Sequence, residues 1–348
     1  MIAIHARSGS FSDKWIEYCE THRIAYKLVD CYALDIIEQM RPCSGLMWHW
    51  AESDGKSLLF ARQLTAALET MGKKVFPGSA TIWYYDDKIA QKYLLEAIGA
   101  PLIPSHVFYD KRKALEWAEA ADFPKVFKLR GGILSENVRI ARDRKAGVKF
   151  IERAFGSGYQ AKSRVHYLNK QLRRFGRERN LQSFVGIGRG AYRVAFPTPQ
   201  VTNNTTIEKN YVYFQDFVPN NDHDIRVVVI GKRAFAVKRM VHEGDFRASG
   251  SGHIIYDPLQ IPEECLKIAF DVTDRLGSQC AAYDFVFGEN GPMIVEVSYG
   301  FSISAHRPCP GYWTYELEWN EGEFFFESFM IEDFIAECSS IQRENERA

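Results

Sequence analysis

The sequence predicts an α/β and α+β protein in which an N-terminal parallel α/β domain is followed by a two-lobed core. Three observations support this fold class. Strand-like and helical patterns alternate over the first 85 residues, long strand-like runs dominate from Tyr211 onward, and glycine-rich loops interrupt the strands of the core. We expect domains over 1–85, 86–214 and 215–338, and a flexible tail over 339–348.

The N-terminal domain is predicted from strand-like runs that alternate with helical patterns. The runs are IAIH (2–5), AYKLVD (25–30), GLMWHW (45–50) and KVFP (74–77), and the helical patterns cover 13–22 and 57–72. This alternation predicts a parallel sheet. The loop ARSGSFS after the first strand lacks the three-glycine spacing of a dinucleotide-binding turn.

Three aromatic residues end the third predicted strand, at Trp48, His49 and Trp50. Loops at strand ends bind ligands in parallel α/β sheets, so these rings could stack on a sugar or a base. Burial in the core explains them equally well, and the sequence leaves both interpretations open.

The first lobe of the core is predicted to begin with a helix near Asp86, in DDKIAQKYLLEAIGA, which Gly99 and Pro101 terminate. The strand-like runs VFY and VFKL follow, then the loop RGGILSENV and the run VRIAR. A basic segment lies within 156–210. It holds nine basic residues against the single acid Glu178, namely Lys162, Arg164, Lys170, Arg173, Arg174, Arg177, Arg179, Arg189 and Arg193.

The basic segment has three interpretations. It could be a solvated helix on an inserted lobe, a site for a polyanionic small molecule such as a nucleotide-linked sugar acid, or an RNA-binding surface with interleaved aromatics. The chain has 44 basic and 44 acidic residues and no RNA-binding motif, which argues against nucleic acid.

The second lobe is predicted from long strand-like runs and two helices. The runs are YVYFQDFV (211–218), DIRVVVI (224–230) and RAFAVKRMV (233–241), and the helices lie at 262–276 and near 322–338. No run approaches membrane-spanning length and no signal peptide precedes the first strand, so we expect a cytoplasmic protein. Seven cysteines without CxxC pairs are expected to be reduced thiols.

A hairpin in this lobe, CAAYDFVFGENGPMIVEVSYG (280–300), carries one acid on each strand. Folding at 288–291 brings Asp284 almost opposite Glu296, while Val295 and Val297 are expected to continue the core. Like charges across a hairpin are destabilising unless a cation or a basic side chain lies between them. Magnesium is held by one or two carboxylates plus phosphates, which fits this pair; two solvated acids are the alternative.

Basic residues next to glycine-rich loops suggest phosphate binding. Lys128 precedes Arg130-Gly131-Gly132, whose backbone N–H groups could approach phosphate oxygens closely. The strand pattern could direct Arg226 and Arg239 to one side, with Arg247 in a second glycine-rich loop. Each pattern taken alone is also typical of an ordinary turn or a solvated face.

The order of these segments resembles the ATP-grasp superfamily of carboxylate–amine ligases. The resemblance rests on FPKVFKLRGGILSENV, YVYFQDFV, DIRVVVIGKRAFAVKRM with GDFRASGSG, and YDFVFGENGPMIVEVS, and it spans about 86–337. The α/β unit before it resembles the domain that usually precedes an ATP-grasp core.

The resemblance implies a role for each matching position. Lys88 and Lys128 would contact ATP phosphates beneath a flap over 131–137. Gln215 stands where many members carry a glutamate, and its amide oxygen could accept a hydrogen bond from the adenine amino group. The implied cofactor-binding residues are Lys88, Lys128, Gly131, Gly132, Ser135, Gln215, Phe217, Val218 and, for the ribose, Asp224. The implied catalytic residues are Arg226, Arg239 and Arg247, and the implied metal ligands are Asp284, Glu296 and Ser298.

Ser298 departs from the family pattern, which has an asparagine there, and this puts the second metal position in doubt. His242, His253 and His306 lie near the motifs and are either general-base candidates or ordinary histidines. Arg307 could pair with a substrate carboxylate.

The implied cofactors are ATP and Mg²⁺, and the implied reaction is ATP-dependent ligation. A carboxylate would be activated as an acyl phosphate and joined to an amine, forming an amide or peptide bond and releasing ADP and phosphate. The expected partners are a small-molecule carboxylate and amine, with no membrane, and a homodimer is an arrangement that the sequence allows. The alternatives are a kinase of the same fold acting on a hydroxyl group, and a nucleotide- or RNA-binding protein without turnover.

Overall fold

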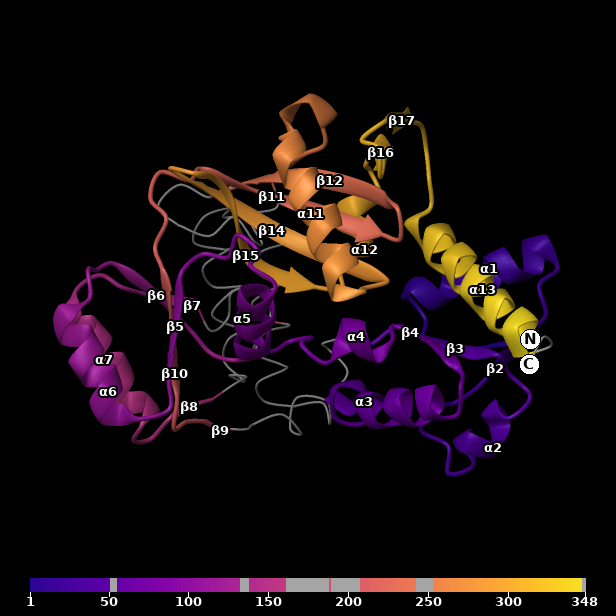
Figure 1. Cartoon of the computed structure of the whole chain (residues 1–348), viewed down its shortest axis with the longest axis horizontal. Helices are drawn as coiled ribbons and strands as arrows, with labels where there is room; N and C mark the ends of the chain where they lie inside the picture. The colour runs from indigo at the N-terminus through magenta and orange to yellow at the C-terminus, as the bar shows by residue number, and fades with distance from the viewer. Residues whose placement is uncertain (51–54, 132–137, 161–187, 189–206, 242–252, 346–348) are drawn as a thin grey trace.

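The computed structural model describes the chain except for residues 51–54, 132–137, 161–187, 189–206, 242–252 and 346–348 (Figure 1). Its described strands form three main sheets. One sheet is parallel and lies in the N-terminal part of the chain, and the other two are antiparallel and belong to the core. This arrangement confirms the predicted fold class.

The N-terminal sheet is parallel, with the strand order β2-β1-β3-β4. Its strands are β1 (Ile2–His5), β2 (Tyr26–Leu28), β3 (Gly45–Trp48) and β4 (Lys74–Phe76). The helices of this part are α1 (Phe11–His22), α2 (Ile36–Met40), α3 (Gly55–Thr70) and α4 (Ser79–Ile82). β2 and β3 are shorter than the runs 25–30 and 45–50 that predicted them.

The first antiparallel sheet has the order β5-β10-β6-β7. Its strands are β5 (Ser105–Phe108), β10 (Val212–Asp216), β6 (Lys125–Lys128) and β7 (Val138–Ala141). The helices α6 (Lys111–Ala120) and α7 (Arg144–Ala154) cover one face of it (Figure 1). Phe127 and Phe214 are buried beneath these helices. A short pair, β8 (Tyr159–Gln160) with β9 (Ile207–Glu208), lies at the ends of the basic segment.

The second antiparallel sheet has the order β15-β14-β11-β12-β16-β17, with β13 paired to β12. Its strands are β11 (His223–Ile230), β12 (Arg233–Met240), β13 (Ile254–Ile255), β14 (Cys280–Gly288), β15 (Gly291–Ser298), β16 (Gly311–Thr314) and β17 (Trp319–Glu321). The helix α11 (Glu263–Leu276) covers one face, because its apolar side packs against Val227, Val229 and Tyr283. Two short helical segments, η1 (Pro258–Gln260) and α12 (Ile303–His306), lie in the connections.

The helix α5 (Lys88–Ala97) connects the N-terminal part to the core and contacts β15. Asp87 caps its first turn, since the Asp87 carboxylate accepts hydrogen bonds from the N–H groups of Ile89 and Ala90. The cap fixes where the helix begins, and so places Lys88 in its first turn.

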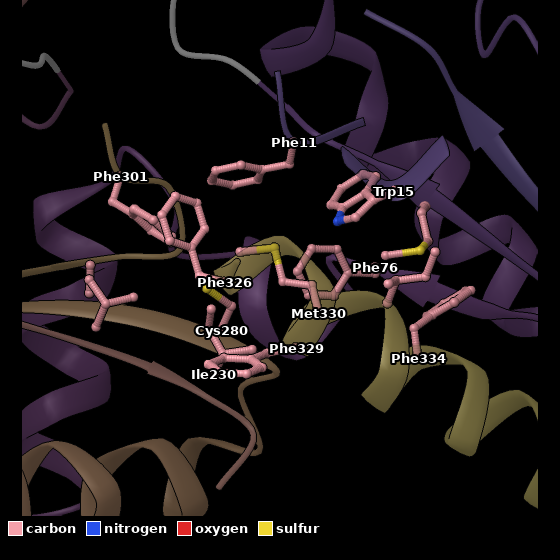
Figure 2. Close-up of a cluster of buried hydrophobic side chains, with 14 of the residues drawn as sticks. Phe11, Trp15, Phe76, Ile230, Cys280, Phe301, Phe326, Phe329, Met330 and Phe334 are labelled. Atoms are coloured by element: carbon pink, nitrogen blue, oxygen red, sulfur yellow. The ribbon is translucent and has the colours of Figure 1, made fainter. Parts of the chain in front are cut away.

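On the opposite face of the second sheet, the last helix, α13 (Phe326–Asn345), contacts β11 and packs against α1, and residues of both helices join Val228 and Ile230 in one buried cluster. Figure 2 shows the aromatic cluster between them, with Phe11 and Trp15 facing Phe326 and Met330. The closing helix was expected near 322–338, and the tail expected over 339–348 is helical as far as Asn345. All seven cysteines are free and buried, in agreement with the predicted thiols.

The hairpin of β14 and β15 contains a β-bulge that the sequence did not reveal. Gly288 pairs with Gly291, so a regular ladder would place Asp284 opposite Val295. The register shifts between Asp284 and Phe285, and Asp284 is therefore directly opposite Glu296. Val295 becomes the extra residue and is only half-buried, whereas Val297 is fully buried. The prediction that Val295 continues the core was wrong for this reason.

Among the helices that the structure describes, none is both long enough and apolar enough to cross a membrane.

Candidate active site

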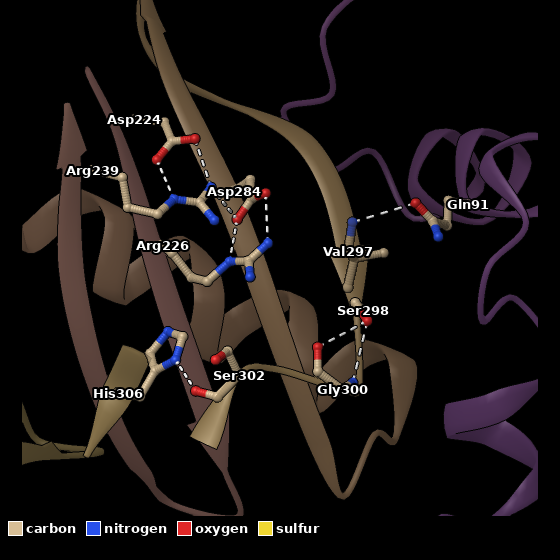
Figure 3. Close-up of polar contacts among 10 residues, drawn as sticks. All are labelled: Gln91, Asp224, Arg226, Arg239, Asp284, Val297, Ser298, Gly300, Ser302 and His306. Carbon is tan, nitrogen blue, oxygen red and sulfur yellow. Dashed lines mark hydrogen bonds and ion pairs between the residues drawn. The ribbon is translucent and has the colours of Figure 1, made fainter. Parts of the chain in front are cut away.

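Two aspartates and two arginines form a buried network across three neighbouring strands (Figure 3). Arg226 on β11 is opposite Asp284 on β14, and Asp224 on β11 is opposite Arg239 on β12. These four side chains share one face of the sheet, because residues two apart on a strand point the same way. The same face carries Val228 and becomes apolar further along.

The carboxylate of Asp284 is enclosed by both guanidinium groups. Arg226 donates to it from Nε at 2.6 Å and from a terminal nitrogen at 2.8 Å, and Arg239 contacts it at 2.9 Å. Arg239 also holds Asp224 through two bonds of 2.6 Å. Burial alone would raise the pKa of Asp284, but the two arginines outweigh burial and hold its pKa well below the usual range. Asp284 is therefore a carboxylate at any physiological pH.

Glu296, the other acid of the hairpin, has a different environment. Its carboxylate lies 3.0 Å from the Nζ atom of Lys88 on α5, and its side chain is 35% exposed, compared with 9% for Asp284. The backbone N–H of Lys88 donates to the carbonyl oxygen of Arg130 at 2.9 Å. This bond holds the chain just after β6 against the start of α5. The predicted Lys88 and Glu296 positions therefore meet, with the glutamate oxygens accessible.

Lys128 on β6 is buried, and its ammonium group donates to Oε1 of Gln215 at 2.6 Å. Burial lowers the pKa of Lys128 to about 8. The positive charge of Lys88 also lowers this pKa, whereas the negative charges of Glu296 and Asp284 raise it. Because Lys88 and Glu296 both affect this pKa, their charged groups lie near the ammonium group of Lys128. A buried cation beside a neutral amide is a poorly compensated charge.

The amide of Gln215, which the resemblance places at the adenine amino group, already has protein partners on both of its polar atoms. The oxygen accepts the bond from Lys128, and the amide nitrogen donates to Oγ of Ser105 at 3.2 Å. The buried ammonium needs an acceptor, which decides the orientation of the amide. Tyr213 also bonds to Ser105, at 2.9 Å. Sequence reasoning missed these two supporting residues, although Tyr213 shares a strand face with Gln215.

The remaining nucleotide-binding predictions are placed only in part. Phe217 and Val218 follow β10 and are half-buried, and Gly131 lies against Asp86. A Cβ atom at Gly131 would come 3.4 Å from the Asp86 carbonyl oxygen, so the chain passes close there. Gly132, Ser135, Arg247 and His242 lie outside the described residues, as does most of the basic segment.

The predicted metal ligands fit one cation better than two. Three contacts from arginines occupy most of the about four acceptor positions of the Asp284 carboxylate. The Ser298 hydroxyl donates to the Gly300 carbonyl oxygen at 3.1 Å and accepts from the Gly300 N–H at 3.2 Å. Within the described residues no three His, Cys, Asp or Glu side chains gather as a metal site. Glu296, accessible and anionic, fits a magnesium ion shared with phosphates.

The other candidates take ordinary structural roles or stay open. Trp48 and Trp50 are buried in the N-terminal core, and the ring of His49 stacks on the ring of Phe11 with 3.8 Å between the ring centres. His306 is buried between Phe235 and Phe301, which lowers its pKa to about 3, and His253 is exposed.

Arg307, which could have paired with a substrate carboxylate, instead pairs with the carboxylate of Glu327 at 2.6 Å. No local pattern predicts this partner, since Glu327 lies 20 residues further along the chain, in α13.

Comparison with known proteins shows what this chain and its fold are similar to. Residues 192–305 match the model of the RimK-like ATP-grasp domain. The chain is 25% identical over 232 residues to the alpha-aminoadipate–LysW ligase LysX of Sulfurisphaera tokodaii, covering 66% of this chain and 65% of that relative.

Two solved structures are similar over nearly the whole chain. A RimK domain ATP-grasp protein from Sphaerobacter thermophilus has a TM-score of 0.54 at 17% identity, over 96% of this chain and 99% of that one. The D-alanine–D-alanine ligase of Bacillus anthracis, solved with ATP, has a TM-score of 0.54 at 13% identity, over 99% and 97%. At such low identity, the structural similarity shows a shared fold and no more.

The chain therefore shares its fold with the ATP-grasp proteins named above. It carries a RimK-like ATP-grasp domain over residues 192–305, which include β10 and the strands β11 to β15 of the large antiparallel sheet. The resemblance seen in the motifs is confirmed, and so is the predicted type of enzyme, a ligase that forms carbon–nitrogen bonds.

Proposed function

We propose that this protein uses ATP to activate a small-molecule carboxylate as an acyl phosphate and then joins the carboxylate to an amine. One observation carries the proposal. A series of charged groups runs from β6 to the large sheet, through Lys128, Lys88 with Glu296, and Asp284 with Arg226. The reaction brings one anion against another, and this series can hold both.

The two lysines are proposed to bind the phosphates of ATP. Both ammonium groups are buried, with 5% exposure for Lys88 and 4% for Lys128, and their anionic counterparts do not cancel them completely. A phosphate oxygen would relieve the cost of keeping these charges out of water. Phe217 and Val218 would offer backbone groups to the adenine, and Asp224 would lie on the ribose side.

Arg226 and Arg239 are proposed to position and stabilise the group that is transferred. Each guanidinium group uses Nε and one terminal nitrogen for the aspartates, and the other terminal nitrogen still has donors to offer. The aspartates fix the planes of both groups before any ligand arrives, so little reorganisation is needed in the transition state. Arg247 would join them from the second glycine-rich loop.

A magnesium ion bound with ATP would neutralise phosphate charge, and Glu296 is the residue proposed to hold it. The amine then attacks the acyl carbon, the carbon–oxygen bond to phosphate breaks, and phosphate departs with the electron pair. Loss of a proton from the attacking nitrogen completes the amide. We propose a sugar acid or a nucleotide-linked acid as the carboxylate, on the strength of the basic segment within 156–210.

The proposal is tested by ADP release from Mg-ATP with hydroxylamine as a surrogate amine and a panel of amino acids, sugar acids and nucleotide-linked uronic acids. Hydroxylamine intercepts acyl phosphates, so a hydroxamate is expected with one class of carboxylate. Lys128→Met should abolish it, whereas Lys125→Met on the same strand should retain it, because Lys125 pairs with Asp216 at 2.7 Å. ADP release that never yields a hydroxamate would contradict the acyl phosphate and favour transfer to a hydroxyl group.

A further inference from the structure

Two of the three positions expected to bind metal are already engaged by other groups. Asp284 accepts three contacts from arginines, and Ser298 turns its hydroxyl back to Gly300 (Figure 3). A divalent cation next to Asp284 would have to bind through the one acceptor position that remains, or displace a bidentate arginine, the strongest arrangement that a carboxylate makes with a basic side chain. Two guanidinium groups within hydrogen-bonding distance would also repel the cation.

Glu296 is less restricted than Asp284. It pairs with the ammonium group of Lys88 at 3.0 Å, and its side chain is about four times as exposed as that of Asp284. The β-bulge brings Glu296 opposite Asp284, yet the arginines approach Asp284 from the neighbouring strands. The two acids of the hairpin are therefore neighbours with different partners.

We propose that this protein binds ATP with a single divalent cation, held by Glu296, and that Arg226 and Arg239 occupy the carboxylate of Asp284 in place of a second cation. Asp284 is then a positioning residue, which orients the two arginines rather than ligating metal. This inference rests on the proposed function, because it assumes that the nucleotide binds in this site.

The structure suggests how to open the second position. Arg226→Met removes two of the three contacts on Asp284 and leaves the third, from Arg239 at 2.9 Å, so the buried carboxylate keeps a partner. With Asp284 and Glu296 facing each other, the variant should gain a site for a second cation. Arg233→Met is the matched control. Arg233 lies on the adjacent strand, pairs with Glu332 at 3.1 Å and is 21% exposed, compared with 19% for Arg226.

The experiment counts bound Mn²⁺ by electron paramagnetic resonance, in the presence of a saturating non-hydrolysable ATP analogue whose own binding is measured separately by calorimetry. We expect one Mn²⁺ per chain for the wild type and for Arg233→Met, and two for Arg226→Met. Two ions on the wild type would overturn the inference, and so would one ion on Arg226→Met with its fold intact by circular dichroism. Failure of the analogue to bind would instead count against the proposed function.

Discussion

The charge of Lys128 should make the protein less stable, and a pH series can reveal the cost. Its pKa falls from 10.5 in the unfolded chain to about 8 in the folded protein, because burial removes water from the ammonium group. One pKa unit is worth about 1.4 kcal/mol, so the cost below pH 8 is about 3 kcal/mol. Between pH 8 and 10.5 the unfolded chain binds more protons, and the free energy of unfolding therefore rises with pH.

Lys128→Met removes this cost. For 348 residues the entropy of unfolding is about 0.7 kcal/mol per degree, so 3 kcal/mol corresponds to about 4 °C. At pH 7 and without ligand, the melting temperature of the variant should lie above that of the wild type by up to about 4 °C. Loss of the hydrogen bond to Gln215 makes this difference smaller. At pH 9.5 the wild type has recovered about 2 kcal/mol, so the gap should narrow by about 3 °C.

Differential scanning calorimetry of both proteins at pH 7 and 9.5 measures the two gaps. Lys125→Met serves as the control, because it breaks the ion pair with Asp216 and should lower the melting temperature. A gap between Lys128→Met and the wild type that is the same at both pH values would refute the reasoning, since it would mean that Lys128 keeps its proton throughout the range.

Three further predictions concern the same site and the core. Gln215→Glu places a carboxylate 2.6 Å from Lys128, so the pKa of Lys128 should rise and the pH dependence of the melting temperature between pH 7 and 9.5 should flatten; an unchanged slope would contradict this pairing. Arg239→Met leaves two buried aspartates short of a partner and should destabilise the protein by about 3–5 kcal/mol, seen as a lower melting temperature, whereas Lys238→Met next to it should have little effect. The seven buried thiols should react with a thiol reagent only after unfolding, and fast labelling of the native protein would argue against their burial.

The parts of the fold that depend on local pattern could be predicted from the sequence. Alternation of apolar and polar residues gives the strands of both lobes, and the turn at 288–291 gives the hairpin that brings Asp284 near Glu296. The bulge could not be predicted, because an extra residue on one strand is defined only by its pairing with the other. Val295 illustrates the point, since its apolar side chain fits the core pattern, yet it is the residue left over.

The partners of the charged side chains depend on strand order, which no local pattern encodes. Arg226 and Asp284 are 58 residues apart and meet because β14 returns to lie beside β11. The same strand order sets Arg239 against Asp224 on the other side of β11. A motif can therefore identify Asp284 as a metal position by its resemblance to the family pattern, while the side chains of β11 and β12 decide whether its carboxylate is available.

The charges of the site also bear on how many cations it needs. Asp224, Asp284, Arg226 and Arg239 cancel one another, which leaves directed N–H donors but no net charge. The remaining groups, Lys88, Lys128 and Glu296, leave a single excess positive charge while both lysines are protonated. ATP with one magnesium ion is still an anion, so it complements this excess, and its binding should favour the protonated form of Lys128 and raise the pKa above 8. A second cation would bring the charge of the bound nucleotide close to zero, and the excess positive charge of the two buried lysines would then be offset less well.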